Sequence, residues 1–132
     1  WMHGARFLIC PSVCFENFPL AIVEAFACGV PVIAPRLGAM AEIVTDGKNG
    51  LHFTPGDARD LAAKVNWAWS HRSEMRFMGK GARADYEAKY TSEQNYQSLI
   101  SIYNRAIVVR QEAGNLTGAI KTLGSQEPRT IR

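Results

Sequence analysis

Residues 14–35 read CFENFPLAIVEAFACGVPVIAP, and this stretch decides the fold. We expect a helix over Pro19–Cys28, because proline suits the first helical position and Gly29 can supply the left-handed conformation that ends many helices. The apolar run Val30–Pro35 predicts a buried strand with prolines at its ends. A helix followed at once by a buried strand is typical of an α/β protein.

The rest of the chain extends this alternation. Short apolar runs predict strands at residues 7–11 and 51–53. Helices are expected at residues 40–44, 58–70, 73–90 and 92–110. Asp57 is the expected N-cap of the helix over 58–70.

Two of these helices carry more detailed expectations. The helix over 58–70 should bury Leu61, Val65 and either Trp69 or Ala68. The next helix, over 73–90, contains Gly79 and Gly81, which we expect to form a soft spot.

The fold class expected from this order is α/β, with a short parallel sheet in the first half and helices in the second. Residues 1–110 form the expected domain, and residues 111–132 are expected to be a loose tail. Three short strands make a small sheet, and the chain opens on Trp1, so we expect it to begin inside a longer protein.

Composition excludes several classes of protein. The net charge of +3 over 132 residues is too small and too scattered to predict nucleic-acid binding. The nearest basic cluster, Arg76 to Lys89, is interleaved with acidic residues and is interpreted as solvated helix surface. Three cysteines without ligand spacing favour a reducing compartment and no metal. No run approaches the roughly 18 apolar residues of a membrane span.

The loop before the first helix is a candidate anion site. Ligands of open parallel sheets bind beyond the carboxyl ends of the strands, where loops lead into helix N-termini. Phe18 cannot cap the helix with a side-chain oxygen, so the amides of Leu20 and Ala21 are candidate donors to a phosphate. The alternative is that water or Asn17 satisfies these amides.

Two glutamates flank this helix end. Glu24 is the only charge between Asn17 and Pro35, and we expect it to be largely buried. It could accept hydrogen bonds from paired hydroxyls, such as those of a ribose, or pair with a distant Arg or Lys. Glu16 lies in the loop, either close to a bound ligand or as an ordinary surface carboxylate.

The loop after the second strand should reach the same edge of the sheet. Gly38 would allow close approach of the backbone to a ligand, or it is a turn glycine. Arg36 is a further candidate contact. Glu42 either lies on the surface or orients the Arg36 loop.

In these residues the chain resembles the donor-binding half of retaining glycosyltransferases of family 4, which have the two-domain GT-B fold. The matching residues cover Ala5 to Asp57, about forty percent of the chain. They comprise Glu16 and Glu24 at the family's spacing, Cys10-Pro11-Ser12, Asn17-Phe18-Pro19-Leu20, Glu24 through Ala34, Gly38 through Val44, Asp46-Gly47, Asn49-Gly50-Leu51 and Pro55-Gly56-Asp57.

The resemblance implies a role for each site residue. Glu24 would bind the ribose of a nucleotide-diphosphate-sugar, and the backbone at Phe18, Pro19, Leu20 and Ala21, next to Asn17, would hold the diphosphate. Glu16 would act at the donor sugar, where it would orient the sugar or form a covalent adduct.

The family comparison also shows departures and missing parts. Asn17 and Ala39 stand where many relatives have glycine. The acceptor domain and the basic residues that grip the diphosphate have no counterpart in this sequence. We therefore expect the isolated chain to be inactive and its partners to be a donor, a carbohydrate, lipid-linked or small-molecule acceptor, and an N-terminal domain.

The implied reaction transfers a sugar with retention of anomeric configuration and needs no metal or other cofactor. We expect a cytoplasmic location, with peripheral attachment to a membrane left open. Two alternatives remain: another GT-B enzyme, such as a sugar-nucleotide epimerase, and a domain that binds nucleotide or a partner protein without turnover.

Overall fold

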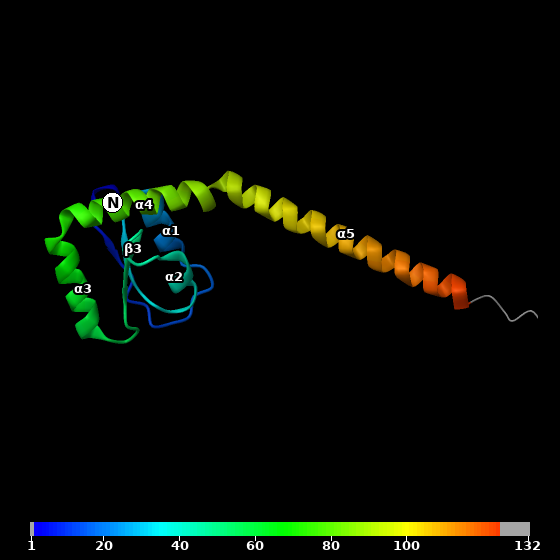
Figure 1. Ribbon diagram of the computed structural model, residues 1–132, viewed down its shortest axis with the longest axis horizontal. Coiled ribbons are helices and arrows are strands. Elements are labelled where there is room, and N and C mark those ends of the chain that lie inside the picture. Colours follow the sequence, from blue (N-terminus) through cyan, green and yellow to red (C-terminus); the bar gives the residue numbers. More distant parts are fainter. Residues whose placement is uncertain (1, 125–132) are drawn as a thin grey trace, which may run out of the picture. The chain divides into compact units, whose positions relative to one another are not determined.

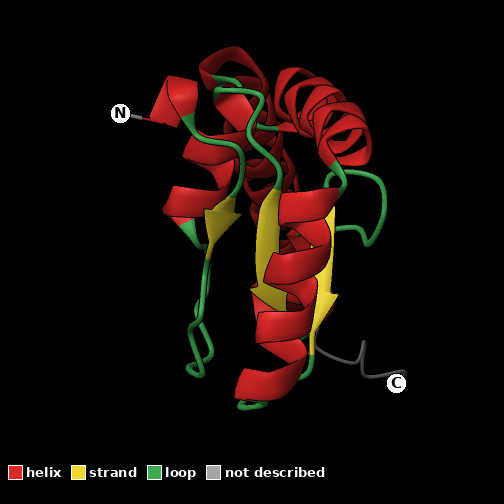
Figure 2. Cartoon of the chain, turned by 90° about the vertical axis from the view of Figure 1, so that its left-hand side faces the viewer, coloured by secondary structure: helices red, strands yellow, loops and turns green. Residues whose placement is uncertain are grey.

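The structure is a computed structural model that describes residues 2–124, with side chains described up to Arg110. The chain divides after Thr91 into two compact units. The first unit holds a three-stranded parallel sheet of β1 (Leu8–Ile9), β2 (Val32–Pro35) and β3 (Gly50–Phe53), in the order β1-β2-β3. The predicted parallel sheet is therefore confirmed, and Figure 2 shows its strands running in one direction.

Helices connect and follow these strands (Figure 1). They are the 3-10 helix η1 (Met2–Gly4), α1 (Leu20–Ala27), α2 (Gly38–Ile43), α3 (Ala58–Ser70), α4 (Arg72–Lys89) and α5 (Ser92–Gly124). The predictions for α1, α3 and α4 are correct to within one residue at each end, whereas α2 begins two residues earlier than expected. The short η1 was not predicted.

The structure confirms two predicted helix ends, the N-cap of α3 and the glycine that follows α1. The carboxylate of Asp57 accepts from the amides of Arg59 and Asp60 at 2.9 and 3.1 Å. Gly29, just beyond α1, has a φ of 68°, the left-handed conformation expected there. Both features follow from local sequence alone.

The sheet carries helices on both faces, in front of and behind the strands in Figure 2. Because side chains alternate along a strand, Val32 and Ala34 pack toward α1, whereas Ile33 packs in a separate cluster with Ala68 and Met78. Ala68, not Trp69, is the buried residue of α3, since Trp69 is 62% exposed. The core thus consists of two apolar layers around β2.

The two glycines of α4 are places of close packing and not the soft spot that we expected. A Cβ at Gly79 would lie 2.4 Å from the carbonyl oxygen of Gly29. A Cβ at Gly81 would lie 2.2 Å from the carbonyl oxygen of Lys48. Only glycine lets α4 approach these two turns so closely, so both residues fix the helix onto the sheet layer.

A buried polar network joins the turn before β3 to α4. The side-chain amide of Asn49 donates to Asp85 Oδ2 at 2.8 Å and to the carbonyl oxygen of Ile43 at 3.2 Å. Lys48 Nζ donates to Asp85 Oδ1 at 2.8 Å. Burial would raise the pKa of Asp85, but these hydrogen bonds outweigh it and hold the pKa below its ordinary value.

The second unit contains α5, which is longer than expected. We predicted a helix to about Arg110 and a loose tail over residues 111–132, but the helix continues to Gly124. The prediction is therefore wrong for residues 111–124, and residues 125–132 lie outside the described part. Apolar side chains along α5 are exposed in this structure, with Leu99 at 45% and Ile102 at 56%.

Candidate functional site

The loops at the carboxyl edge of the sheet contact one another. The loop after β1 carries Glu16, and the loop after β2 leads into α2 at Gly38. A Cβ at Gly38 would lie 3.0 Å from Cδ1 of the Phe15 ring, and Gly38 has a φ of 49°. Glycine is favoured at this position for two reasons: the backbone has a positive φ, and a side chain would crowd the Phe15 ring. The contact places the residue next to Glu16 against the start of α2.

The N-terminus of α1 faces this same edge and has no side-chain cap. Pro19 occupies the N-cap position, and its carbonyl oxygen accepts from the amide of Ile22 at 3.0 Å. Within the part of the chain that the structure describes, no hydrogen bond reaches the amides of Leu20 and Ala21, so Asn17 does not satisfy them. Two donors at the positive end of a helix are thus available to an anion.

Glu24 is exposed, which corrects the expectation that it is buried. The buried residues of α1 are Ile22, Val23, Ala25 and Phe26. Glu24 lies four residues after Leu20, which is 64% exposed, so both belong to the open side of the helix. No ion pair to Glu24 occurs among the described residues, and its carboxylate is open to a ligand.

Glu16 is also exposed, at the end of the loop that leaves β1. The pKa of the Cys10 thiol is raised, mainly by burial and to a lesser extent by the negative charge of Glu16. The negative charge of Glu16 is therefore felt at Cys10, just beyond the carboxyl end of β1.

The apolar residues around Glu16 were not predicted as part of the site. Val13, Phe15 and Phe18 are 66%, 79% and 50% exposed. The ring of Phe18 lies 6.2 Å from that of Tyr90, at the end of α4. The sequence could have indicated this, because apolar side chains in a loop are unusual unless a ligand or partner covers them.

Arg36 takes a different position from Gly38. It lines a pocket of about 410 Å³ beyond the ends of β2 and β3, together with Asp46, Asp60 and Lys64. Glu42 is exposed on α2, which agrees with the surface interpretation. The structure thus brings Gly38 into contact with the loop that carries Glu16, whereas Arg36 lines the pocket beyond β2 and β3.

Neither a metal-binding cluster nor a membrane-spanning helix occurs among the described residues. No group of three or more His, Cys, Asp or Glu side chains in that range could hold a metal ion. No helix in that range is both long enough and apolar enough to span a bilayer.

Comparison with known proteins gives a consistent result. The family model for "Glycosyl transferases group 1" matches residues 1–85. An uncharacterized glycosyltransferase of Methanocaldococcus jannaschii is 31% identical over 103 residues, which cover 78% of this chain and 29% of that protein.

Two solved structures share the fold. The sucrose-phosphate synthase of Thermosynechococcus elongatus is 30% identical, with a TM-score of 0.73 over 80% of this chain and 26% of that one. Anabaena HepE, solved in complex with UDP and glucose, is 27% identical, with a TM-score of 0.73 over 78% of this chain and 28% of that one.

These proteins are much longer than the region that they share with this chain, which spans less than a third of their length. The structural similarity confirms the expected fold class, part of a Rossmann-like domain of the GT-B type. The family match extends over more than half of the sequence. The chain therefore belongs to the glycosyl transferases group 1 family.

Proposed function

We propose that this chain supplies the donor-binding half of an enzyme that transfers a sugar from a nucleotide-diphosphate-sugar to an acceptor. The observation that carries the proposal is the arrangement on α1. Free amides at Leu20 and Ala21 stand at the helix N-terminus, and an exposed carboxylate, Glu24, lies on the following turn. The similarity to HepE, which was solved with UDP and glucose, supports this assignment.

Each group on α1 suits one part of a nucleoside diphosphate. The amides of Leu20 and Ala21 can donate to phosphate oxygens, aided by the helix dipole. The carboxylate of Glu24 can accept from the two hydroxyls of a ribose. The exposure of Glu24 strengthens this role, because a ligand can reach the carboxylate without displacing a protein partner.

We assign the donor sugar to Glu16. The residue follows Phe15, whose ring contacts Gly38 at the start of α2. In the proposed reaction the bond between the sugar and the diphosphate breaks, and negative charge grows on the leaving diphosphate. Donors at the N-terminus of α1 would stabilise that charge, while Glu16 orients the sugar so that the new bond forms with retention.

A second candidate function is binding of nucleotide or of a partner protein without turnover. Val13 and Phe15 are apolar loop residues that are exposed at this edge. Such residues are often covered by a bound partner, so they favour binding of a partner protein there. Both candidates use the carboxyl edge of the sheet, but only the enzyme breaks the bond between the sugar and the diphosphate.

Calorimetric titration with UDP, GDP and ADP separates nucleotide binding from its absence, and assay of the full-length protein with the matching sugar donors then tests transfer. Binding together with transfer supports the enzyme. Binding without transfer from any donor supports the second candidate.

A further inference from the structure

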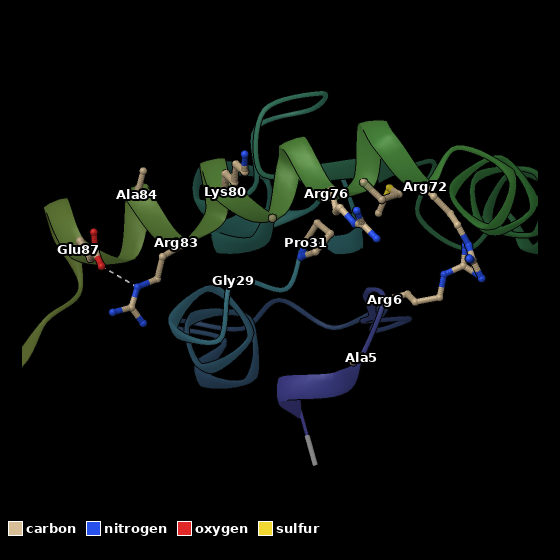
Figure 3. Close-up of a pocket in the computed structure, with 12 residues that line it drawn as sticks. Ala5, Arg6, Gly29, Pro31, Arg72, Arg76, Lys80, Arg83, Ala84 and Glu87 are labelled. Carbon is tan, nitrogen blue, oxygen red and sulfur yellow. Dashed lines mark hydrogen bonds and ion pairs between the residues drawn. The ribbon is translucent and has the colours of Figure 1, made fainter.

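A basic groove lies at the opposite end of the sheet from the candidate donor site. It is formed by Ala5 and Arg6 before β1, by Gly29 and Pro31 before β2, and by one side of α4 (Figure 3). Its volume is about 680 Å³. Ala5 and Arg6 precede β1, and Gly29 and Pro31 precede β2, so the groove is at the amino edge of the sheet. None of its residues belongs to the site proposed above.

Positive charge dominates this groove. Five cationic side chains line it, against the single carboxylate of Glu87. They are Arg6, Arg72, Arg76, Lys80 and Arg83. Glu87 is already engaged, because it accepts from Arg83 Nε at 2.7 Å. The remaining four cations have no carboxylate partner within the described residues.

The fold holds these cations close together without neutralising them. Arg72, Arg76 and Lys80 follow at four-residue spacing along α4, an arrangement in which like charges repel. Figure 3 shows the guanidinium groups of Arg6 and Arg72 side by side. The pKa of Arg6 is lowered, first by burial and then by the charge of Arg72.

Arg6 is fixed in this position. Its Nη2 donates to the carbonyl oxygen of Trp69 at 2.7 Å, and its guanidinium lies 4.0 Å from the centre of the Trp69 ring. The floor of the groove is rigid as well, since Gly79 packs directly on the carbonyl of Gly29. A preorganised guanidinium loses little freedom when it binds an anion.

Two acidic residues of α4, Glu74 and Asp85, do not line the groove. Glu74 accepts from the hydroxyl of Ser73, and Asp85 is buried with Lys48 and Asn49. Of the acidic residues of α4, only Glu87 lines the groove, where it pairs with Arg83. The other four cations therefore line the groove without a carboxylate partner among the described residues.

We propose that this groove is a binding site for a phosphate-bearing ligand. Planar guanidinium groups match phosphate oxygens in a bidentate geometry, and Arg6, Arg72 and Arg76 supply three of them. The phosphate can belong to a soluble metabolite or to a lipid headgroup, because both present the same oxygens.

The test uses the 132-residue chain with two probes. Inorganic pyrophosphate, followed by ¹H–¹⁵N NMR, represents a soluble ligand, and co-sedimentation with phosphatidylcholine vesicles, with and without phosphatidylglycerol, represents a lipid headgroup. NMR also distinguishes the two anion sites, because the groove is reported by the amides of Gly29 and Gly79 and the donor site by those of Leu20 and Ala21.

The variant is Arg72→Gln with Arg76→Gln, and its control is Arg59→Gln with Arg105→Gln, which removes two exposed charges outside the groove. We expect the groove variant to weaken binding by about 25-fold, or about five-fold for each cation removed, and the control to bind as the parent does.

Pyrophosphate shifts at Gly29 and Gly79 identify a soluble ligand, and binding confined to the phosphatidylglycerol vesicles identifies a headgroup. The proposal is overturned if neither probe binds, or if the groove variant and its control bind equally. If pyrophosphate shifts only the amides of Leu20 and Ala21, the result supports the donor site and overturns the proposal that the groove binds phosphate.

Discussion

The ring of Phe15 lies against Gly38, so closely that a Cβ at Gly38 would be 3.0 Å from Phe15 Cδ1. This contact joins the loop after β1 to the start of α2 at the carboxyl edge of the sheet. We therefore expect Gly38→Ala to weaken UDP binding as well as stability. The loss of stability should be about 1 kcal/mol or more, because alanine at positive φ is strained and its methyl group displaces Phe15.

Gly47→Ala is the matched control for this prediction. Gly47 has a φ of 74°, but nothing lies within 4 Å of a Cβ placed there. The control therefore carries the backbone strain without the clash. Urea denaturation and calorimetry on both variants separate the two effects, and equal UDP affinity in both would show that the Phe15 contact does not support the site.

The contact between Gly79 and Gly29 predicts a strong effect on stability. A methyl group at Gly79 would meet the carbonyl oxygen of Gly29, a backbone atom that cannot rotate away. We expect Gly79→Ala to destabilise the first unit by about 1–3 kcal/mol, measured by urea denaturation. Gly4→Ala, with open space around it, should be close to neutral.

Asp85 should make the protein sensitive to acid. Its pKa is lower in the folded chain than its ordinary value of 3.8, so its contribution is present above about pH 4 and is lost as the pH falls through the folded pKa. Asp85→Asn should cost about 1–3 kcal/mol at neutral pH and flatten the loss of stability below pH 4.

Denaturation at several pH values tests this prediction. Asp57→Asn is a suitable control, because Asp57 is exposed and asparagine also caps helices well. If Asp85→Asn and the parent lose stability in parallel as the pH falls, the network around Asp85 is not the source of the acid sensitivity.

The N-cap of α3 gives an independent prediction. Asp57 accepts from two backbone amides, so Asp57→Ala should lower stability by about 1 kcal/mol, whereas Asp57→Asn should retain most of it. Thermal denaturation of the two variants measures the difference. Equal losses in both would indicate that the charge, and not the hydrogen bonds, stabilises the helix.

Local chemistry made much of the fold predictable. Gly29, Asp57 and the apolar run over Val32–Pro35 act through their own or adjacent backbone, so their structural roles can be inferred from neighbouring residues. The uncapped end of α1 could be inferred in the same way, because it depends on Phe18 and Pro19 alone.

Features that depend on distant segments could not be predicted. Gly79 needs to be glycine because the carbonyl of Gly29, fifty residues earlier, packs against it, and no residue near Gly79 in the sequence reveals that contact. The basic groove needs Arg6, which α4 meets only in the folded chain. Both therefore required the tertiary structure.

The errors at Glu24 and in α5 have different causes. The apolar neighbours of Glu24 suggested burial, but a helix places Ile22 and Phe26 on one side and Glu24 on another. In α5 we expected the helix to end near Arg110, but it continues through Gly114. A single glycine costs a helix only about 1 kcal/mol relative to alanine, and the helix continues past it to Gly124.

The central claim is that Glu24 accepts hydrogen bonds from the ribose of a nucleotide, and the most direct measurement is calorimetric titration of UDP, GDP and ADP into the parent and Glu24→Gln. Glu74→Gln is the control, since Glu74 is exposed on α4. We predict that Glu24→Gln weakens binding of the preferred nucleotide by about 1–3 kcal/mol while the control leaves it unchanged. Equal affinity of all three proteins, or no binding of any nucleotide to the full-length protein, would contradict the account.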